Sequence, residues 1–196
     1  MVKVAKSIKY GATYTVEEKS LIEAAIFIAD KPLALETLQQ HFSLNRKQIK
    51  AIIAQLQQEY LHRGIELVNV ASGYRFQAKA QLSEKLTVLF TEKAPKYSRA
   101  LLETLALIAY KQPITRGEIE DIRGVAVSSH IMKTLLERYW IKILGHKEVP
   151  GRPALYGTTK EFLDYFGLAS LEQLPELNIT NREEKFSLVL ENINSP

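Results

Sequence analysis

One stretch of the sequence decides the fold: Val149-Pro150-Gly151-Arg152-Pro153-Ala154-Leu155-Tyr156-Gly157-Thr158-Thr159. Its two prolines exclude a helix, because proline fixes φ, lacks an N–H donor and pushes the preceding residue into extended geometry. Apolar residues 141–144 come before this stretch, and a helix-like segment, residues 160–166, comes after it. We therefore predict a β-hairpin with a proline-stiffened tip between two helices, an order that is typical of a winged helix.

The composition is that of a globular chain. Its 196 residues are 46% apolar and 24% charged, with a net charge of +4, which allows one or two domains. The absence of cysteine excludes disulfides, thiolate nucleophiles and cysteine metal sites. No apolar run approaches the roughly 18 residues of a membrane span. Residues 1–14 form a basic arm without the apolar segment of a signal peptide, so we expect a cytoplasmic protein with no membrane partner.

The first half of the chain contains helix caps and a second hairpin. The run Thr15-Val16-Glu17-Glu18 is a capping box, and Asn45 can cap a later helix. Two period-two strands joined by Ala71-Ser72-Gly73 predict a hairpin. We predict helices at residues 16–30, 35–42, 46–62 and 82–90 and strands at residues 65–70 and 74–78.

The pattern then starts again at an offset of 80 residues. Residues 101–111 align on residues 21–31 with identical pairs Leu21/Leu101, Glu23/Glu103, Ile28/Ile108, Ala29/Ala109 and Lys31/Lys111. A second capping box begins at Thr115, Ser128 or Ser129 can cap the next helix, and a third capping signal lies at residues 158–161. The chain therefore reads as a tandem duplication. We predict an α+β, mainly α fold with tandem winged-helix domains at residues 15–92 and 96–168, a flexible basic arm at 1–14 and a flexible tail at 169–196.

The first helix of each predicted domain is apolar nearly all round. Residues 21–29 and 101–110 hold more apolar side chains than one core face requires. Covering the spare face of each helix is worth several kcal/mol, at about 25 cal/mol per Å². This surplus favours protein partners over DNA.

Signs of catalysis are poor. The histidines at 41, 62, 130 and 146 fall on different predicted elements, and none has the i,i+4 partner of a zinc helix. No nucleophile can be paired with a base. We expect no enzyme activity, no cofactor and no metal site.

Basic residues allow a weak DNA contact. Arg46, Lys47 and Lys50 begin the third helix of the first domain, where winged helices enter the major groove, although a solvated basic face explains them better. Arg152 at the hairpin tip suits a turn or a protein contact about as well as a DNA contact. The alternative to a protein-binding subunit is a dimeric winged-helix transcription regulator that binds specific DNA sequences.

Several long motifs resemble the family of segregation and condensation protein B, and the likeness runs from about residue 18 to residue 177. The matching runs are Leu101-Leu102-Glu103-Thr104-Leu105-Ala106-Leu107-Ile108-Ala109-Tyr110-Lys111-Gln112-Pro113-Ile114-Thr115-Arg116-Gly117-Glu118-Ile119-Glu120-Asp121-Ile122-Arg123-Gly124-Val125, Leu135-Leu136-Glu137-Arg138, residues 150–159, Phe162-Leu163 and Phe166-Gly167-Leu168.

The resemblance implies a non-enzymatic subunit of a bacterial SMC–kleisin complex, located at the nucleoid, that serves chromosome condensation and partition during cell division. It implies a homodimer formed through the first domain, with Ile22, Ile26 and Phe27 as candidate contacts. It also implies that the second domain binds the kleisin, segregation and condensation protein A, and that the SMC ATPase is an indirect partner. The candidate kleisin contacts are Leu102, Leu105, Leu107, Tyr110, Arg152 and Tyr156.

Two departures from the family pattern border the hairpin. Ala126-Val127-Ser128 stands where members usually have Asn-Ser-Asp, so the cap of the following helix falls to Ser128 or Ser129. Tyr139-Trp140-Ile141 stands where members usually have Gly-Leu-Ile. Without that glycine the usual left-handed stop is lost, so we expect the helix to end in another way, with Trp140 as a packing anchor.

Overall fold

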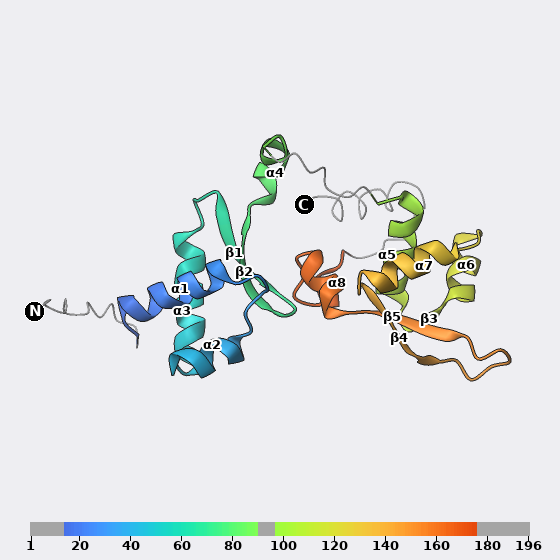
Figure 1. The fold of residues 1–196 in the computed structure, drawn as a ribbon, viewed down its shortest axis with the longest axis horizontal. Helices are drawn as coiled ribbons and strands as arrows, with labels where there is room; N and C mark the ends of the chain where they lie inside the picture. The colour runs from blue at the N-terminus through green and yellow to red at the C-terminus, as the bar shows by residue number, and fades with distance from the viewer. Residues whose placement is uncertain (1–13, 90–96, 176–196) are drawn as a thin grey trace, which may run out of the picture. The chain divides into compact units, whose positions relative to one another are not determined.

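The computed structural model describes residues 14–89 and 97–175, and Figure 1 shows their helices and strands. The chain divides into two compact units, one ending at Glu84 and one beginning at Lys85. Both units combine helices with a small antiparallel sheet, so the predicted α+β, mainly α fold is confirmed. Residues 1–13 of the predicted arm (1–14) and residues 176–196 of the predicted tail (169–196) lie outside the described residues.

The first unit begins where its capping boxes place the helices. The Thr15 side chain accepts from the Glu18 backbone N–H, and Asn45 does the same for Gln48, which fixes the starts of two helices. A hairpin follows, and α4 then crosses the border at residue 84. The elements are α1 (Val16–Ile28), α2 (Leu35–Phe42), α3 (Arg46–Glu59), β1 (Ile65–Val70), β2 (Gly73–Ala78) and α4 (Ala80–Thr87).

The core of the first unit lies between its three helices and the inner face of the hairpin. A single bridge between Leu33 and Tyr74 adds a third chain segment beside β2. Gly73 allows this contact, because its φ of 142° is open to glycine and a Cβ there would lie 2.1 Å from the Leu33 carbonyl oxygen. The buried residues are Ile22, Ile26, Leu35, Leu38, Leu44, Ile49, Ile52, Ile53, Leu56 and Leu67.

The second unit repeats this order with one further strand. Its sheet has the order β3-β5-β4, and all pairs are antiparallel. The two-residue strand β3 was not predicted; it corresponds to the Leu33 bridge of the first unit. The elements are α5 (Arg99–Lys111), β3 (Ile114–Thr115), α6 (Arg116–Arg123), α7 (Ser129–Glu137), β4 (Ile141–His146), β5 (Ala154–Thr158), α8 (Lys160–Tyr165) and the 3₁₀ turn η1 (Leu171–Gln173).

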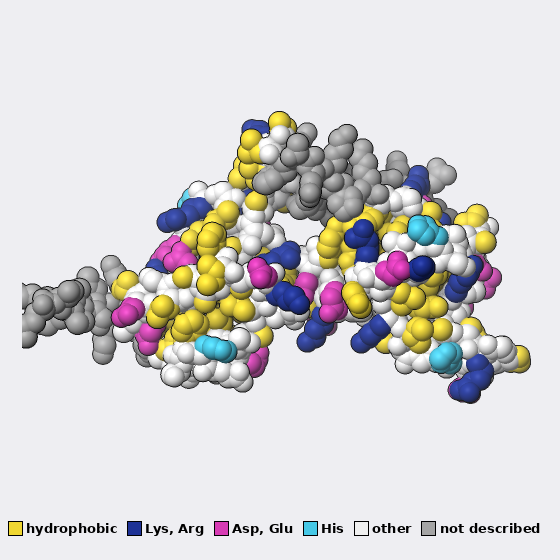
Figure 2. Space-filling model, viewed as in Figure 1, with side chains coloured by type: hydrophobic (Ala, Val, Ile, Leu, Met, Phe, Trp, Pro, Cys, Tyr) yellow, Lys and Arg dark blue, Asp and Glu magenta, His cyan; other side chains and the backbone are white. Residues whose placement is uncertain are grey.

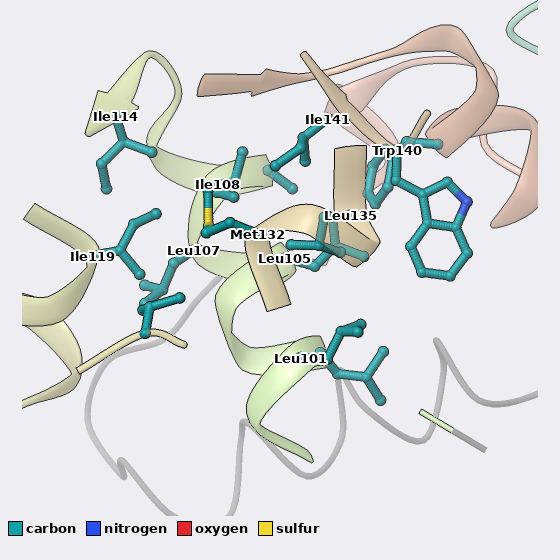
Figure 3. Close-up of a cluster of buried hydrophobic side chains, with 14 residues drawn as sticks. Leu101, Leu105, Leu107, Ile108, Ile114, Ile119, Met132, Leu135, Trp140 and Ile141 are labelled. Carbon is teal, nitrogen blue, oxygen red and sulfur yellow. The ribbon is translucent and has the colours of Figure 1, made fainter. Parts of the chain in front are cut away.

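Helix α5 runs through the centre of the second core. Figure 3 shows Leu105, Ile108 and Leu135 pointing toward one another, with Trp140 beside Leu135. The indole of Trp140 also lies 4.7 Å from the Tyr165 ring and 5.2 Å from the Phe166 ring, between centroids. Trp140 is therefore the packing anchor that the sequence predicts.

The end of α7 corrects one expectation. Tyr139 itself takes the left-handed conformation, with φ of 57°. The N–H of Tyr139 donates to Leu136 and the N–H of Trp140 donates to Leu135, which together form a Schellman motif. The expectation of another kind of helix end was wrong, because a tyrosine occupies the position that glycine usually takes.

Candidate partner-binding surfaces

The outer face of α1 is apolar and exposed. Ile22 and Ile26, predicted as dimer contacts, point into the core of the first unit and are buried. Phe27 is 67% exposed, and Leu21 and Ile28 are 49% and 77% exposed. Figure 2 shows apolar side chains at the surface over this helix. The structure therefore adds Leu21 and Ile28 to Phe27 as an outward set, which we call the α1 face.

The duplicated helix α5 is buried where α1 is exposed. The positions equivalent to Leu21 and Ile28 are Leu101 and Ile108, which are 7% and 0% exposed. Eight of the thirteen residues of α5 are buried. The expectation of a spare apolar face on α5 was wrong, because the second unit covers that face itself.

Residues 168–175, which we call the C-terminal strap, pack against the core of the second unit and reach the end of α5. Leu168 and Leu174 pack against the second core, and η1 forms a single turn between them. The Tyr110 hydroxyl donates to the Pro175 carbonyl oxygen at 2.7 Å, and burial raises the pKa of this tyrosine. The predicted helical turn at residues 171–174 is confirmed as 3₁₀, and this part of the predicted tail is packed on α5.

The predicted kleisin contacts fall into two groups. Leu102, Leu105 and Leu107 are core residues of the second unit. Tyr110 and Tyr156 are half-buried at the edge of that core, and Tyr156 faces Ile114 across the sheet. Arg152 is exposed. Their contact with a kleisin stays a prediction.

The tip of the hairpin is held by ion pairs. Arg152 has a φ of 38° and its Nη2 lies 2.8 Å from the Glu148 carboxylate. Lys147 reaches from the hairpin to Glu118 on α6, with Nζ 2.6 Å from Oε1. Lys147, then the N–H and hydroxyl of Thr115, lower the pKa of the Glu118 carboxyl to about 2. The hairpin is thus tied to the start of α6.

The basic residues of α3 do not form a concentrated site. Arg46, Lys47 and Lys50 are exposed, and Arg46 pairs with Glu36 at 3.1 Å. In the second unit Lys133 pairs with Glu137 at 3.6 Å on the exposed side of α7. Because acidic neighbours pair with Arg46 and Lys133, the geometry gives no specific support to a DNA-reading surface.

Within residues 14–89 and 97–175, no cluster of three or more His, Cys, Asp or Glu side chains is placed to hold a metal ion. In the same ranges, none of the helices combines the length and apolar content that a membrane span requires.

Comparisons with known proteins agree with the motifs. A family model described as segregation and condensation complex subunit ScpB matches residues 20–177. A segregation and condensation protein B homolog of Coxiella burnetii is 55% identical, covering 83% of this chain and 79% of its own length. Segregation and condensation protein B of Syntrophotalea carbinolica is 44% identical, covering 83% of each chain.

A solved structure is also similar in sequence. The crystal structure of ScpB from Mycobacterium tuberculosis is 31% identical and covers 78% of this chain and 96% of that chain. Its TM-score is 0.36. The matched model and the identities over most of the chain show that this protein belongs to the segregation and condensation complex subunit ScpB family.

Proposed function

We propose that this chain is a non-enzymatic subunit of a bacterial SMC–kleisin complex that acts in chromosome condensation and partition. Membership of the ScpB family supports this role. The proposal assigns dimerisation to residues 15–92 and binding of segregation and condensation protein A to residues 96–168. The SMC ATPase is reached through the kleisin, any DNA contact is weak or indirect, and the complex lies at the nucleoid in the cytoplasm.

The difference in exposure between α1 and α5 is the observation that supports dimerisation. The same duplicated helix is covered in one unit and has an exposed apolar face in the other. A second copy of the chain would supply a matching apolar face through a two-fold axis. Full burial of a large apolar side chain is worth roughly 1.5–3 kcal/mol, so Leu21, Phe27 and Ile28 together would contribute several kcal/mol for each protomer.

For the kleisin, the supporting features lie around α5 and the hairpin. Tyr110 and Tyr156 are half-buried aromatic residues, and the exposed Arg152 is held at the tip by Glu148. Tyrosine and arginine are the residue types that carry much of the energy of protein interfaces. Leu102, Leu105 and Leu107 would support this surface from the core beneath it.

The test is a calorimetric titration of the chain with purified segregation and condensation protein A from the same organism. We expect a stable complex and, for Arg152→Ala, an affinity lower by about tenfold, as for a typical interface arginine. Arg46→Ala is the matched control, since Arg46 is also exposed and also has one ion pair. Absence of any complex with the wild-type chain would contradict the proposed function.

A further inference from the structure

The C-terminal strap packs against the second core and reaches Tyr110 on α5, the helix that the proposed function assigns to the kleisin. It leaves α8 at Gly167, where the Leu168 N–H donates to the Leu163 carbonyl oxygen at 2.8 Å. It then forms η1 and ends where the Pro175 carbonyl oxygen accepts the Tyr110 hydroxyl. The strap and a partner segment that contacts Tyr110 would therefore use the same polar group on α5.

Among residues 14–89 and 97–175, few contacts hold the strap. Leu168 and Leu174 are partly buried against the core, whereas Leu171, Glu172 and Gln173 are exposed. Inside the strap, the Ala169 N–H donates to the Gln173 side chain at 2.6 Å and the Leu174 N–H donates to the Leu171 carbonyl oxygen at 3.1 Å. A short segment with few buried contacts opens at low free-energy cost while the rest of the fold stays intact.

The two duplicated helices differ in how far their side chains are buried. Helix α1 occupies the equivalent place in the first unit, yet Phe27 and Ile28 remain exposed there. The first unit nevertheless keeps a buried core on the other side of α1, built around Ile22 and Ile26. Among the described residues, the first unit thus leaves part of its first helix exposed, whereas α5 is largely buried.

We propose that the C-terminal strap regulates partner binding by occupying the α5 surface in the free protein, so that the kleisin binds there only when the strap is released. This inference rests on the proposed function, because it concerns the same site. The apparent affinity then equals the intrinsic affinity multiplied by the fraction of molecules in which the strap is open. Weakening the strap should tighten binding without adding any contact to the partner.

The experiment compares Leu174→Ala with the wild-type chain in calorimetric titrations with full-length segregation and condensation protein A. Leu174 belongs to the strap and packs against the second core. Its truncation therefore weakens the hold of the strap and favours the open state, while α5 itself is unchanged. We expect roughly three- to ten-fold tighter binding for an open fraction that is small in the wild type. Glu172→Gln is the control, because Glu172 is exposed in the same turn, and its affinity should equal that of the wild type.

A second measurement follows the strap itself. Hydrogen exchange of residues 168–175 should become faster in the wild-type chain when the partner is added, because the strap is displaced. Unchanged affinity of Leu174→Ala, or unchanged or slower exchange in the complex, would overturn the strap inference and leave the proposed function standing. If the wild-type chain does not bind the partner either, the proposed function fails and this inference fails with it.

Discussion

Tyr139 shows how one residue can hold a conformation that its own side chain disfavours. A left-handed backbone costs a non-glycine residue about 1–2 kcal/mol, and the Tyr139 side chain is exposed, so it recovers little by packing. We predict that Tyr139→Gly stabilises the second unit by about 1 kcal/mol. The fluorescence of Trp140, the only tryptophan of the chain, reports this unfolding in a urea titration. Tyr139→Ala keeps the left-handed strain and serves as control; a less stable glycine variant would contradict this account.

Replacing two glycines by alanine should change the stability of the units in opposite directions. At Gly73 a Cβ would lie 2.1 Å from the Leu33 carbonyl oxygen, so we expect Gly73→Ala to destabilise the first unit by about 3 kcal/mol or more. Gly117 lies inside α6 with nothing within 4 Å of a new Cβ, so Gly117→Ala should stabilise by up to about 1 kcal/mol. Thermal unfolding followed by circular dichroism measures both. Equal effects would argue against the Leu33–Tyr74 bridge.

Glu118 should make the second unit sensitive to acid. Lys147 and Thr115 lower the pKa of its carboxyl from an ordinary 4.5 to about 2. A lowered pKa stabilises the fold above about pH 5, and this contribution disappears as the pH falls toward 2. The side chain is partly exposed, so solvent reduces the effect. Glu118→Gln should therefore unfold at a lower urea concentration than the wild type at pH 7, and the two urea midpoints should converge near pH 2. Asp121→Asn serves as control. A difference between the midpoints that stays the same at all pH values would refute the assignment.

At the scale of elements, the duplicated helices provide a matched pair of isoleucines. Ile108 is fully buried in α5, whereas Ile28 is exposed at the equivalent position of α1. In a background that carries Leu21→Lys to prevent association, Ile108→Ala should cost about 2–5 kcal/mol and Ile28→Ala less than about 0.5 kcal/mol. Urea unfolding of the two proteins gives both values. Similar costs would mean that the α1 face is buried within its own unit.

Most elements could be predicted from the sequence because local chemistry determines them. The capping boxes at Thr15 and Thr115 fixed helix starts, and the proline-stiffened stretch around Arg152 forms the expected hairpin. The strand at Ile114–Thr115 was missed, because two residues cannot show a period of two and the pairing partner lies about 40 residues away in the chain.

The orientation of α1 was the part of the site that could not be read from the sequence. The helix is apolar nearly all round, so no polar stripe distinguishes the buried Ile22 and Ile26 from the exposed Leu21 and Ile28. On α5 the cover by the strap depends on contacts between residues 65 positions apart, such as Tyr110 and Pro175. Local patterns contain no information on such contacts.

At the scale of the whole molecule, the two units use one duplicated design in two ways. The first leaves the α1 face open, and the second closes α5 with its own chain. An exposed apolar face of this kind is typical of a protein interface. We therefore predict that the first unit holds two copies of the chain together, while the second remains free to bind a different partner.

The most direct test of this claim is the mass of the full chain by size-exclusion chromatography with light scattering. We expect the wild type to have twice the mass of one 22.3 kDa chain, and the double variant Leu21→Lys, Ile28→Lys to have the mass of one chain with unchanged circular dichroism. Leu61→Lys, which places the same charge on an exposed leucine outside α1, should remain a dimer. A monomeric wild type, or a double variant that still forms a dimer, would contradict the central claim.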